Sequence, residues 1–140
     1  MALASVGGGY QNTDGNQSEQ TIGTQAAPQT ATATATLTVA QVTGGLLVGN
    51  PSTTAASYTL PTATLIDATM TNMKVNSTFS LRIINLGTST GLITVVVGTG
   101  ITAVGNLVVA ITGSAAGVSG AAEFMFRKTD TAAYSVYRVA

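Results

Sequence analysis

The stretch Thr78–Leu86 (TFSLRIINL) decides the fold class of this chain. Phe79, Leu81 and Ile83 alternate with polar residues, which is the pattern of a half-buried β-strand, because successive side chains of a strand point to opposite faces. The stretch is also rich in aromatic and branched side chains, which favour strands. It predicts one strand of a larger all-β fold.

Similar strand-like segments lie on both sides of this stretch, separated by Gly, Asn and Ser. Short strands at a spacing of about 8–12 residues are typical of sandwiches and jelly rolls. We therefore expect a single jelly-roll-like β-sandwich of about eight short antiparallel strands. Besides 78–86, the expected strands span residues 35–42, 46–48, 57–60, 92–97, 101–104, 107–112, 121–127 and 134–139.

One segment, residues 62–72, favours a short helix instead. Leu65, Ile66 and Thr69 recur at helical spacing, and Pro61 is expected at the first helical position, where proline is well tolerated. We expect this helix to cover one end or one face of the sandwich.

Residues 1–36 differ from the rest in composition. They contain one Leu, one Val, one Ile and one Tyr among Gly, Gln, Asn, Thr, Ser and Ala. Such a segment cannot bury enough apolar surface to offset the entropy lost on ordering. We predict an extended or disordered N-terminal arm at residues 1–36, followed by the β-sandwich domain at residues 37–140.

The side chains that are missing exclude several classes of function. The chain has no His, Cys or Trp, and five basic and five acidic residues give a formal net charge of zero. Without His or Cys there is no imidazole base, no thiol nucleophile and no Zn, Fe–S or haem site of the usual kind. A balanced charge also gives no excess of Lys and Arg with which to bind the phosphates of a nucleic acid. We expect a protein that is not an enzyme and binds no cofactor, metal, nucleic acid or small-molecule substrate.

Two groups of residues deserve comparison with known kinds of site. Asp67, Glu123 and Asp130 are the acids of the expected domain. They fall on the helix, a strand and a turn, so we interpret them as solvated or subunit-bridging charges and not as a glycosidase pair. The motif at residues 98–103 (GTGITA) lacks the helix that a dinucleotide fingerprint requires, and it predicts a hairpin turn. No catalytic, cofactor-binding or metal-binding residue is assigned.

Residues 87–122 carry no charge, and the window 92–111 is apolar enough to resemble a transmembrane helix. A membrane-anchored or surface-anchored protein is therefore one alternative. Gly98, Gly100 and Gly105 interrupt the run, and its Val, Ile and Thr residues favour strands. We expect strands here and no membrane association.

Several segments together resemble small jelly-roll structural proteins of tailed bacteriophages. They are residues 58–63 (YTLPTA), 79–85 (FSLRIIN), 94–102 (TVVVGTGIT), 124–127 (FMFR) and 134–139 (YSVYRV). The resemblance covers residues 35–140 and leaves out the arm. Proteins of this group occur as capsid decoration (cement) proteins and in fibre modules.

The resemblance implies a virion structural protein that is assembled in the host cytoplasm and sits on the capsid surface. It would be a homotrimer that binds the major capsid protein and stabilises contacts between capsomers. The resemblance leaves open an alternative, a phage tail-fibre, baseplate or receptor-binding β-module. The low charge agrees with either, because a surface so poor in charge suits a protein covered by its own copies or by a partner.

Overall fold

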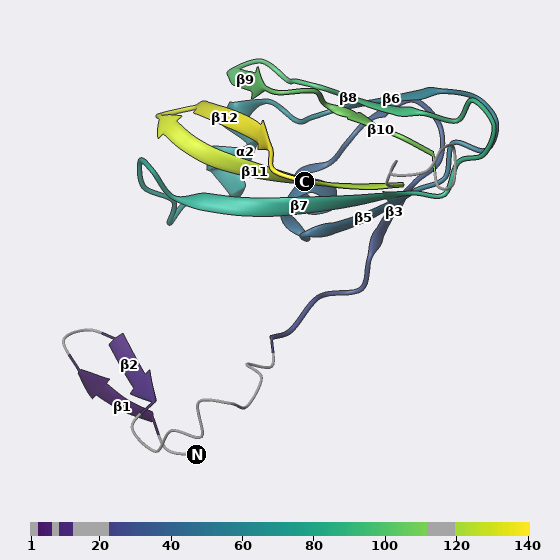
Figure 1. Ribbon diagram of the computed structural model, residues 1–140. Helices are drawn as coiled ribbons and strands as arrows, with labels where there is room; N and C mark the ends of the chain where they lie inside the picture. Colours follow the sequence, from purple (N-terminus) through teal and green to yellow (C-terminus); the bar gives the residue numbers. More distant parts are fainter. Residues whose placement is uncertain (1–2, 7–8, 13–22, 112–119) are drawn as a thin grey trace.

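The computed structural model describes residues 3–6, 9–12, 23–111 and 120–140, and their strands form two main sheets and one small sheet (Figure 1). The small sheet pairs β1 (Leu3–Val6) with β2 (Gly9–Asn12). The four-stranded sheet contains, in order, β10 (Val108–Val109), β8 (Ile93–Val96), β6 (Ala56–Thr59) and β4 (Ala35–Thr36). The six-stranded sheet contains, in order, β3 (Gln29–Ala31), β5 (Leu46–Gly49), β7 (Thr78–Asn85), β11 (Ala121–Asp130), β12 (Ala133–Arg138) and β9 (Ile101–Val104).

Strand pairing is mixed, so the prediction of antiparallel strands is wrong. In the two main sheets, β7–β11, β11–β12 and β8–β10 pair antiparallel, whereas β3–β5, β5–β7, β4–β6, β6–β8 and β9–β12 pair parallel. The cause is the path of the chain, which changes sheet at each step from β3 to β11. From β3 to β8, strands that return to the same sheet after one step in the other pair parallel, whereas β8 and β10 pair antiparallel. The β-rich fold itself is confirmed.

Most expected strands overlap strands of the structure, but of residues 107–112 only Val108–Val109 is a strand, and residue 112 lies outside the described residues. The start of the domain also differs. Residues 35–42 were expected as one strand, but only Ala35–Thr36 is extended, and Val39–Thr43 forms helix α1. The Thr38 hydroxyl accepts the Gln41 N–H at 3.2 Å, and the Gln41 side-chain oxygen accepts the Thr38 N–H at 2.8 Å. This capping box satisfies two backbone donors at the helix start, and it prevails over the alternating pattern.

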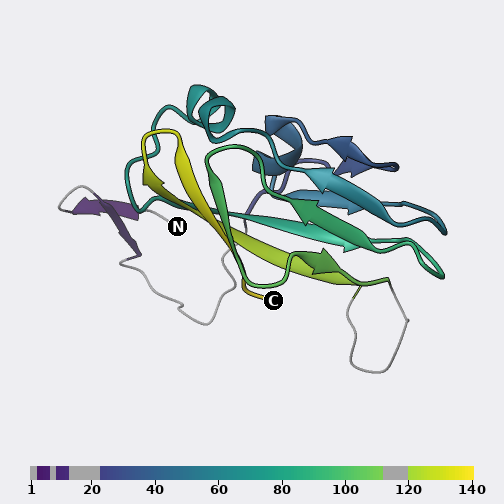
Figure 2. The same cartoon turned by 90° about the horizontal axis from the view of Figure 1, so that it is seen from above.

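The second helix, α2 (Ala63–Thr69), confirms the helix expected at residues 62–72. Its N-cap is Thr62, whose hydroxyl accepts the Leu65 N–H at 3.3 Å, so Pro61 precedes the helix and does not occupy its first position. Ala63 and Ile66 are buried against the core. Figure 2 shows α2 at the end of the sandwich beside the turn that joins β11 to β12.

The core lies between the two main sheets and is built around aromatic side chains. Tyr58, Phe124, Phe126 and Tyr134 are each at most 1% exposed. The Phe126 ring stacks on that of Phe79, with centroids 4.7 Å apart and planes 7° apart. On β11 and β12 buried residues alternate with more exposed ones, so that Phe124, Phe126, Tyr134 and Val136 face the core.

Residues 29–36, which the sequence assigned to the arm, contribute an edge strand to each main sheet. β3 pairs with β5, and β4 pairs with β6. The Gln41 side chain donates to the Thr30 carbonyl at 2.8 Å, and the Ser57 N–H donates to the Thr34 hydroxyl at 3.0 Å. The Thr–Ala alternation thus runs along the edges of both sheets.

The turn at residues 98–100 connects β8 to β9, which lie in different sheets. The expected hairpin is therefore wrong, although the turn is present. Gly100 has a φ of 83°, and a Cβ there would meet the Ala132 carbonyl oxygen at 2.6 Å. Glycine is required where the chain crosses between the sheets.

Candidate functional site

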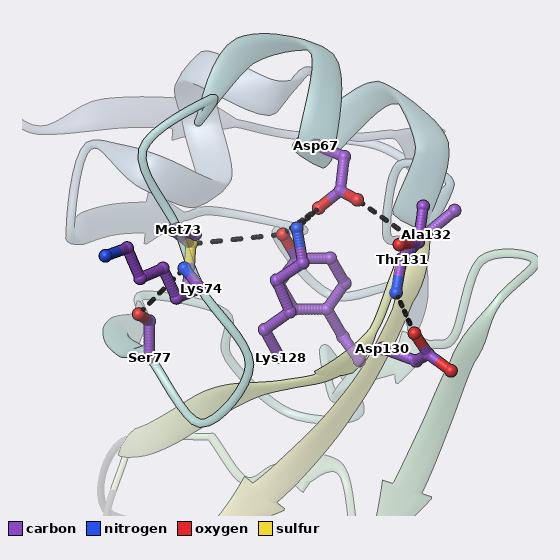
Figure 3. Close-up of polar contacts among 9 residues, drawn as sticks. Asp67, Met73, Lys74, Ser77, Lys128, Asp130, Thr131 and Ala132 are labelled. Carbon is purple, nitrogen blue, oxygen red and sulfur yellow. Dashed lines mark hydrogen bonds and ion pairs between the residues drawn. The ribbon is translucent and has the colours of Figure 1, made fainter.

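Asp67 is the centre of a polar cluster where α2 meets the β11–β12 turn (Figure 3). Its Oδ1 accepts hydrogen bonds from Lys128 Nζ at 2.8 Å and from the Tyr134 hydroxyl at 2.5 Å. Its Oδ2 accepts the backbone N–H of Ala132 at 2.8 Å. The side chains of Lys128 and Asp67 are 13% and 17% exposed, so this ion pair is largely shielded from water.

These contacts fix the protonation states of the cluster. Hydrogen bonds from Lys128 and Tyr134, together with the Ala132 N–H, lower the pKa of the Asp67 carboxyl from 3.8 to about 2. Burial and the neighbouring Asp67 carboxylate raise the pKa of the Tyr134 hydroxyl far above its ordinary value of 10.0. At neutral pH the cluster therefore holds a carboxylate and a neutral phenol.

The cluster is built to hold elements together and not to transfer protons. A general base works best when its pKa lies near the operating pH, whereas the pKa of Asp67 is about 2. Both of its oxygens already accept hydrogen bonds within the chain. Asp67 thus fastens α2 to the β11–β12 turn. Within the described residues, no group of three or more His, Cys, Asp or Glu side chains is placed to hold a metal.

The contacts of Asp67 predict an acid-dependent stability. Because its pKa is lowered in the folded state, the stabilisation it provides is full above about pH 4 and is lost as the pH falls toward 2. We expect Asp67→Asn to lower the free energy of unfolding at pH 7 by about 2 kcal/mol and to have little further effect near pH 2. Urea unfolding across this pH range measures both.

Asp130→Asn is the matched control for that prediction. The Asp130 carboxylate accepts the N–H of Thr131 at 2.7 Å and is directed away from Asp67 (Figure 3). We expect this variant to keep the wild-type pH dependence. An Asp67→Asn protein whose stability still falls between pH 4 and pH 2 as steeply as that of the wild type would contradict the assignment.

The three acids of the domain occupy different surroundings. The Asp67 side chain is 17% exposed, so of the two expected roles, solvated or subunit-bridging charge, the solvated one is wrong for this residue. Glu123 on β11 forms an ion pair with Arg82 on β7 at 3.1 Å, and Asp130 is the exposed last residue of β11. The partners of Asp67, Lys128 and Tyr134, were missed because 61 and 67 residues separate them from it and no local pattern joins them.

Asn85, at the end of β7, is the buried polar side chain of the described core and is 0% exposed. Its Nδ2 lies 2.9 Å from the Gly91 carbonyl oxygen and 3.1 Å from those of Val109 and Ala110. Its Oδ1 accepts the Gly87 N–H at 2.8 Å. One side chain therefore joins the six-stranded sheet, the turn after β7 and the region of β10 in the other sheet.

Both outer faces of the sandwich combine polar and apolar side chains, and on the four-stranded sheet Val96 is 40% exposed. Ser57, Thr59 and Thr94 place hydroxyls on the outer face of the four-stranded sheet. The outer face of the six-stranded sheet is formed by the side chains of β7 and β11 that alternate with the core residues, together with their neighbours on the flanking strands. It combines apolar side chains with the Arg82–Glu123 ion pair and includes a hollow of about 440 Å³ beside Ile84 and Ala121.

A second hollow, of about 450 Å³, lies between the loops that follow β3 and β5 and is lined by uncharged side chains, among them Thr32, Thr34, Asn50 and Thr54. Binding sites for sugars commonly present aromatic and carboxylate side chains, and neither kind lines this hollow. It suggests no ligand.

Neither the helices of the structure nor comparisons with known proteins indicate a function for this chain. In the described part of the chain, no helix has the length and apolar character needed to cross a membrane. No family model, curated protein or solved structure matches the chain.

Proposed function

We propose that this protein is a virion structural protein, a capsid decoration (cement) protein that binds the outer surface of a phage capsid. It would bind the major capsid protein as a homotrimer and stabilise the contacts between capsomers. The observation that carries the proposal is a β-rich domain of two main sheets with an exposed segment, residues 23–28, that leads into a strand at one sheet edge. The phage-like segments of the sequence support it.

The mechanism is mechanical. A trimer that sits on a three-fold position of the shell makes each contact three times, so individually weak contacts add up to firm attachment. Clamping neighbouring capsomers stabilises the assembled shell, because a ligand that binds only the assembled state shifts the equilibrium toward it. Neither step needs a catalytic side chain, and the proposal depends on a two-sheet sandwich and not on one particular strand topology.

The N-terminal arm would supply an additional anchor. Residues 23–28 are exposed and lead into β3 at the edge of the six-stranded sheet. An extended segment can add a strand to an open sheet edge of a partner through backbone hydrogen bonds, which need no particular side chains. This would account for the bland composition of the first residues.

Binding to bare phage heads tests this proposal. We expect the full-length chain to co-sediment with heads that lack it, to saturate, and to reach a stoichiometry that is a multiple of three. Deleting residues 2–22 leaves every strand from β3 onward in place, and we expect it to weaken binding by about tenfold or more, because one of two linked contacts is lost.

The other outcomes of this binding experiment distinguish the decoration role, the anchoring role of the arm and the fibre alternative. Equal occupancy by the deleted and full-length chains would eliminate the anchoring role of the arm. Failure of the full-length chain to bind heads would contradict the decoration role. Binding to isolated tails or host cells instead would favour the fibre, baseplate or receptor-binding alternative.

A further inference from the structure

The outer face of the six-stranded sheet has a regular arrangement of side chains. The register between β7 and β11 places Ile84 beside Ala121, Arg82 beside Glu123, Ser80 beside Met125 and Thr78 beside Arg127. Each neighbouring pair joins a large residue to a smaller one, or a cation to an anion. Along the strands, the Arg82–Glu123 pair lies between the Ile84–Ala121 pair on one side and the Ser80–Met125 pair on the other.

We infer that this face pairs with the same face of a second copy of the chain, around a two-fold axis parallel to the strands and midway between β7 and β11. Such an axis places β7 of one copy against β11 of the other. Arg82 then faces the second copy's glutamate at position 123, the large Ile84 faces the small alanine at 121, and Met125 faces the small serine at 80. An isologous contact requires this self-complementarity.

Charge complementarity identifies the second copy as the partner. The Arg82 side chain is 65% exposed and that of Glu123 is 30% exposed, and one contact of 3.1 Å joins them. Since this contact uses the Nε of Arg82, the exposed guanidinium has further N–H donors, and a carboxylate on the opposite face would accept them in a charge-assisted pair. The two-fold axis supplies that carboxylate twice, and it leaves the interface without net charge from these groups.

The strand order agrees with this axis. The six strands divide evenly around it, so that β5 faces β12 and β3 faces β9 of the second copy. Six strands and the eight residues of β7 span roughly 24 by 27 Å at the widest. That extent is about 650 Å² at most, which is below the ~800 Å² of a standard interface and places this contact among the smaller ones.

This inference goes beyond the proposed function, because it joins copies in twos and needs no capsid. The measurement is the mass of the purified full-length chain in solution, by light scattering or sedimentation velocity across micromolar concentrations. We expect a dimer, or a hexamer if trimers pair. A monomer or an isolated trimer would overturn the contact while leaving binding to heads to be judged separately.

Charge reversal tests the axis itself. We expect Arg82→Glu to weaken the pairing by about a hundredfold, because two carboxylates then face each other at two symmetric positions. Lys74→Glu is the matched control: it changes the charge equally at an exposed loop position, and it should leave the mass unchanged. Glu123→Gln is a milder second variant for the case in which charge reversal prevents folding. We expect it to weaken pairing by about tenfold.

Mixing two variants separates a contact between copies from one within a chain. Arg82→Glu and Glu123→Arg should each fail to self-associate, yet an equal mixture should form a heterodimer, since both symmetric positions then join opposite charges. If the mixture stays monomeric while the double variant Arg82→Glu/Glu123→Arg regains the wild-type mass, the axis is wrong. Equal effects of Arg82→Glu and Lys74→Glu would also overturn it.

Discussion

Replacing Asn85 with Ala is expected to lower the free energy of unfolding by about 3–5 kcal/mol, because the change leaves several buried backbone groups without partners. The side chain is 0% exposed, its amide lies within hydrogen-bonding distance of three carbonyl oxygens, and its oxygen accepts the Gly87 N–H. Each unpaired buried group costs about 1–3 kcal/mol. A loss of this size is a large fraction of the stability of a small domain, which is about 5–15 kcal/mol.

An exposed asparagine elsewhere in the chain offers the control. Asn106 is exposed, and its side chain accepts one hydrogen bond, from the Val108 N–H at 2.9 Å. We expect Asn106→Ala to cost less than about 1 kcal/mol. Urea unfolding of the two variants gives the comparison, and similar losses for both would contradict the assignment of Asn85 as the link between the sheets.

Replacing Phe126 with Ala is the second change with a large expected effect, again about 3–5 kcal/mol. The ring is 0% exposed and stacks on Phe79 at 4.7 Å. The Phe79 ring also packs edge-on against the Tyr134 ring, with centroids 6.4 Å apart. The cavity would therefore loosen the packing of β12, whose Tyr134 donates a hydrogen bond to Asp67. Thermal or urea unfolding measures the loss.

Phe126→Leu separates the removal of volume from the removal of the stack. A leucine fills most of the space, so we expect it to cost about 1–2 kcal/mol. If Phe126→Ala were no more destabilising than Phe126→Leu, the aromatic layer between the sheets would not be the centre of the core.

The sequence predicts strands where alternation is uninterrupted, as in β7, β11 and β12, since burial of one face alone accounts for that pattern. It fails at residues 39–43, where a side-chain cap at Thr38 outweighs the alternation. Pairing direction was also beyond reach, because it depends on which sheet each connection enters, and the turn at residues 98–100 has the same local chemistry in a hairpin and in a crossing between sheets.

The candidate site was harder to foresee than the fold. Asp67 looks like an ordinary helix carboxylate, and only the tertiary structure brings Lys128 and Tyr134 to it. Asn85 reads as the polar end of a strand, although it is buried and joins both sheets. The Arg82–Glu123 pair depends on the register between β7 and β11, which the separate segments do not encode.

We propose that this protein stabilises a phage shell by binding its surface, and the thermal stability of that shell tests the proposal. The measurement is the temperature at which filled heads release their DNA, with and without saturating full-length chain. We expect a higher release temperature for decorated heads and a smaller increase with the chain that lacks residues 2–22. An unchanged release temperature at full occupancy would contradict it.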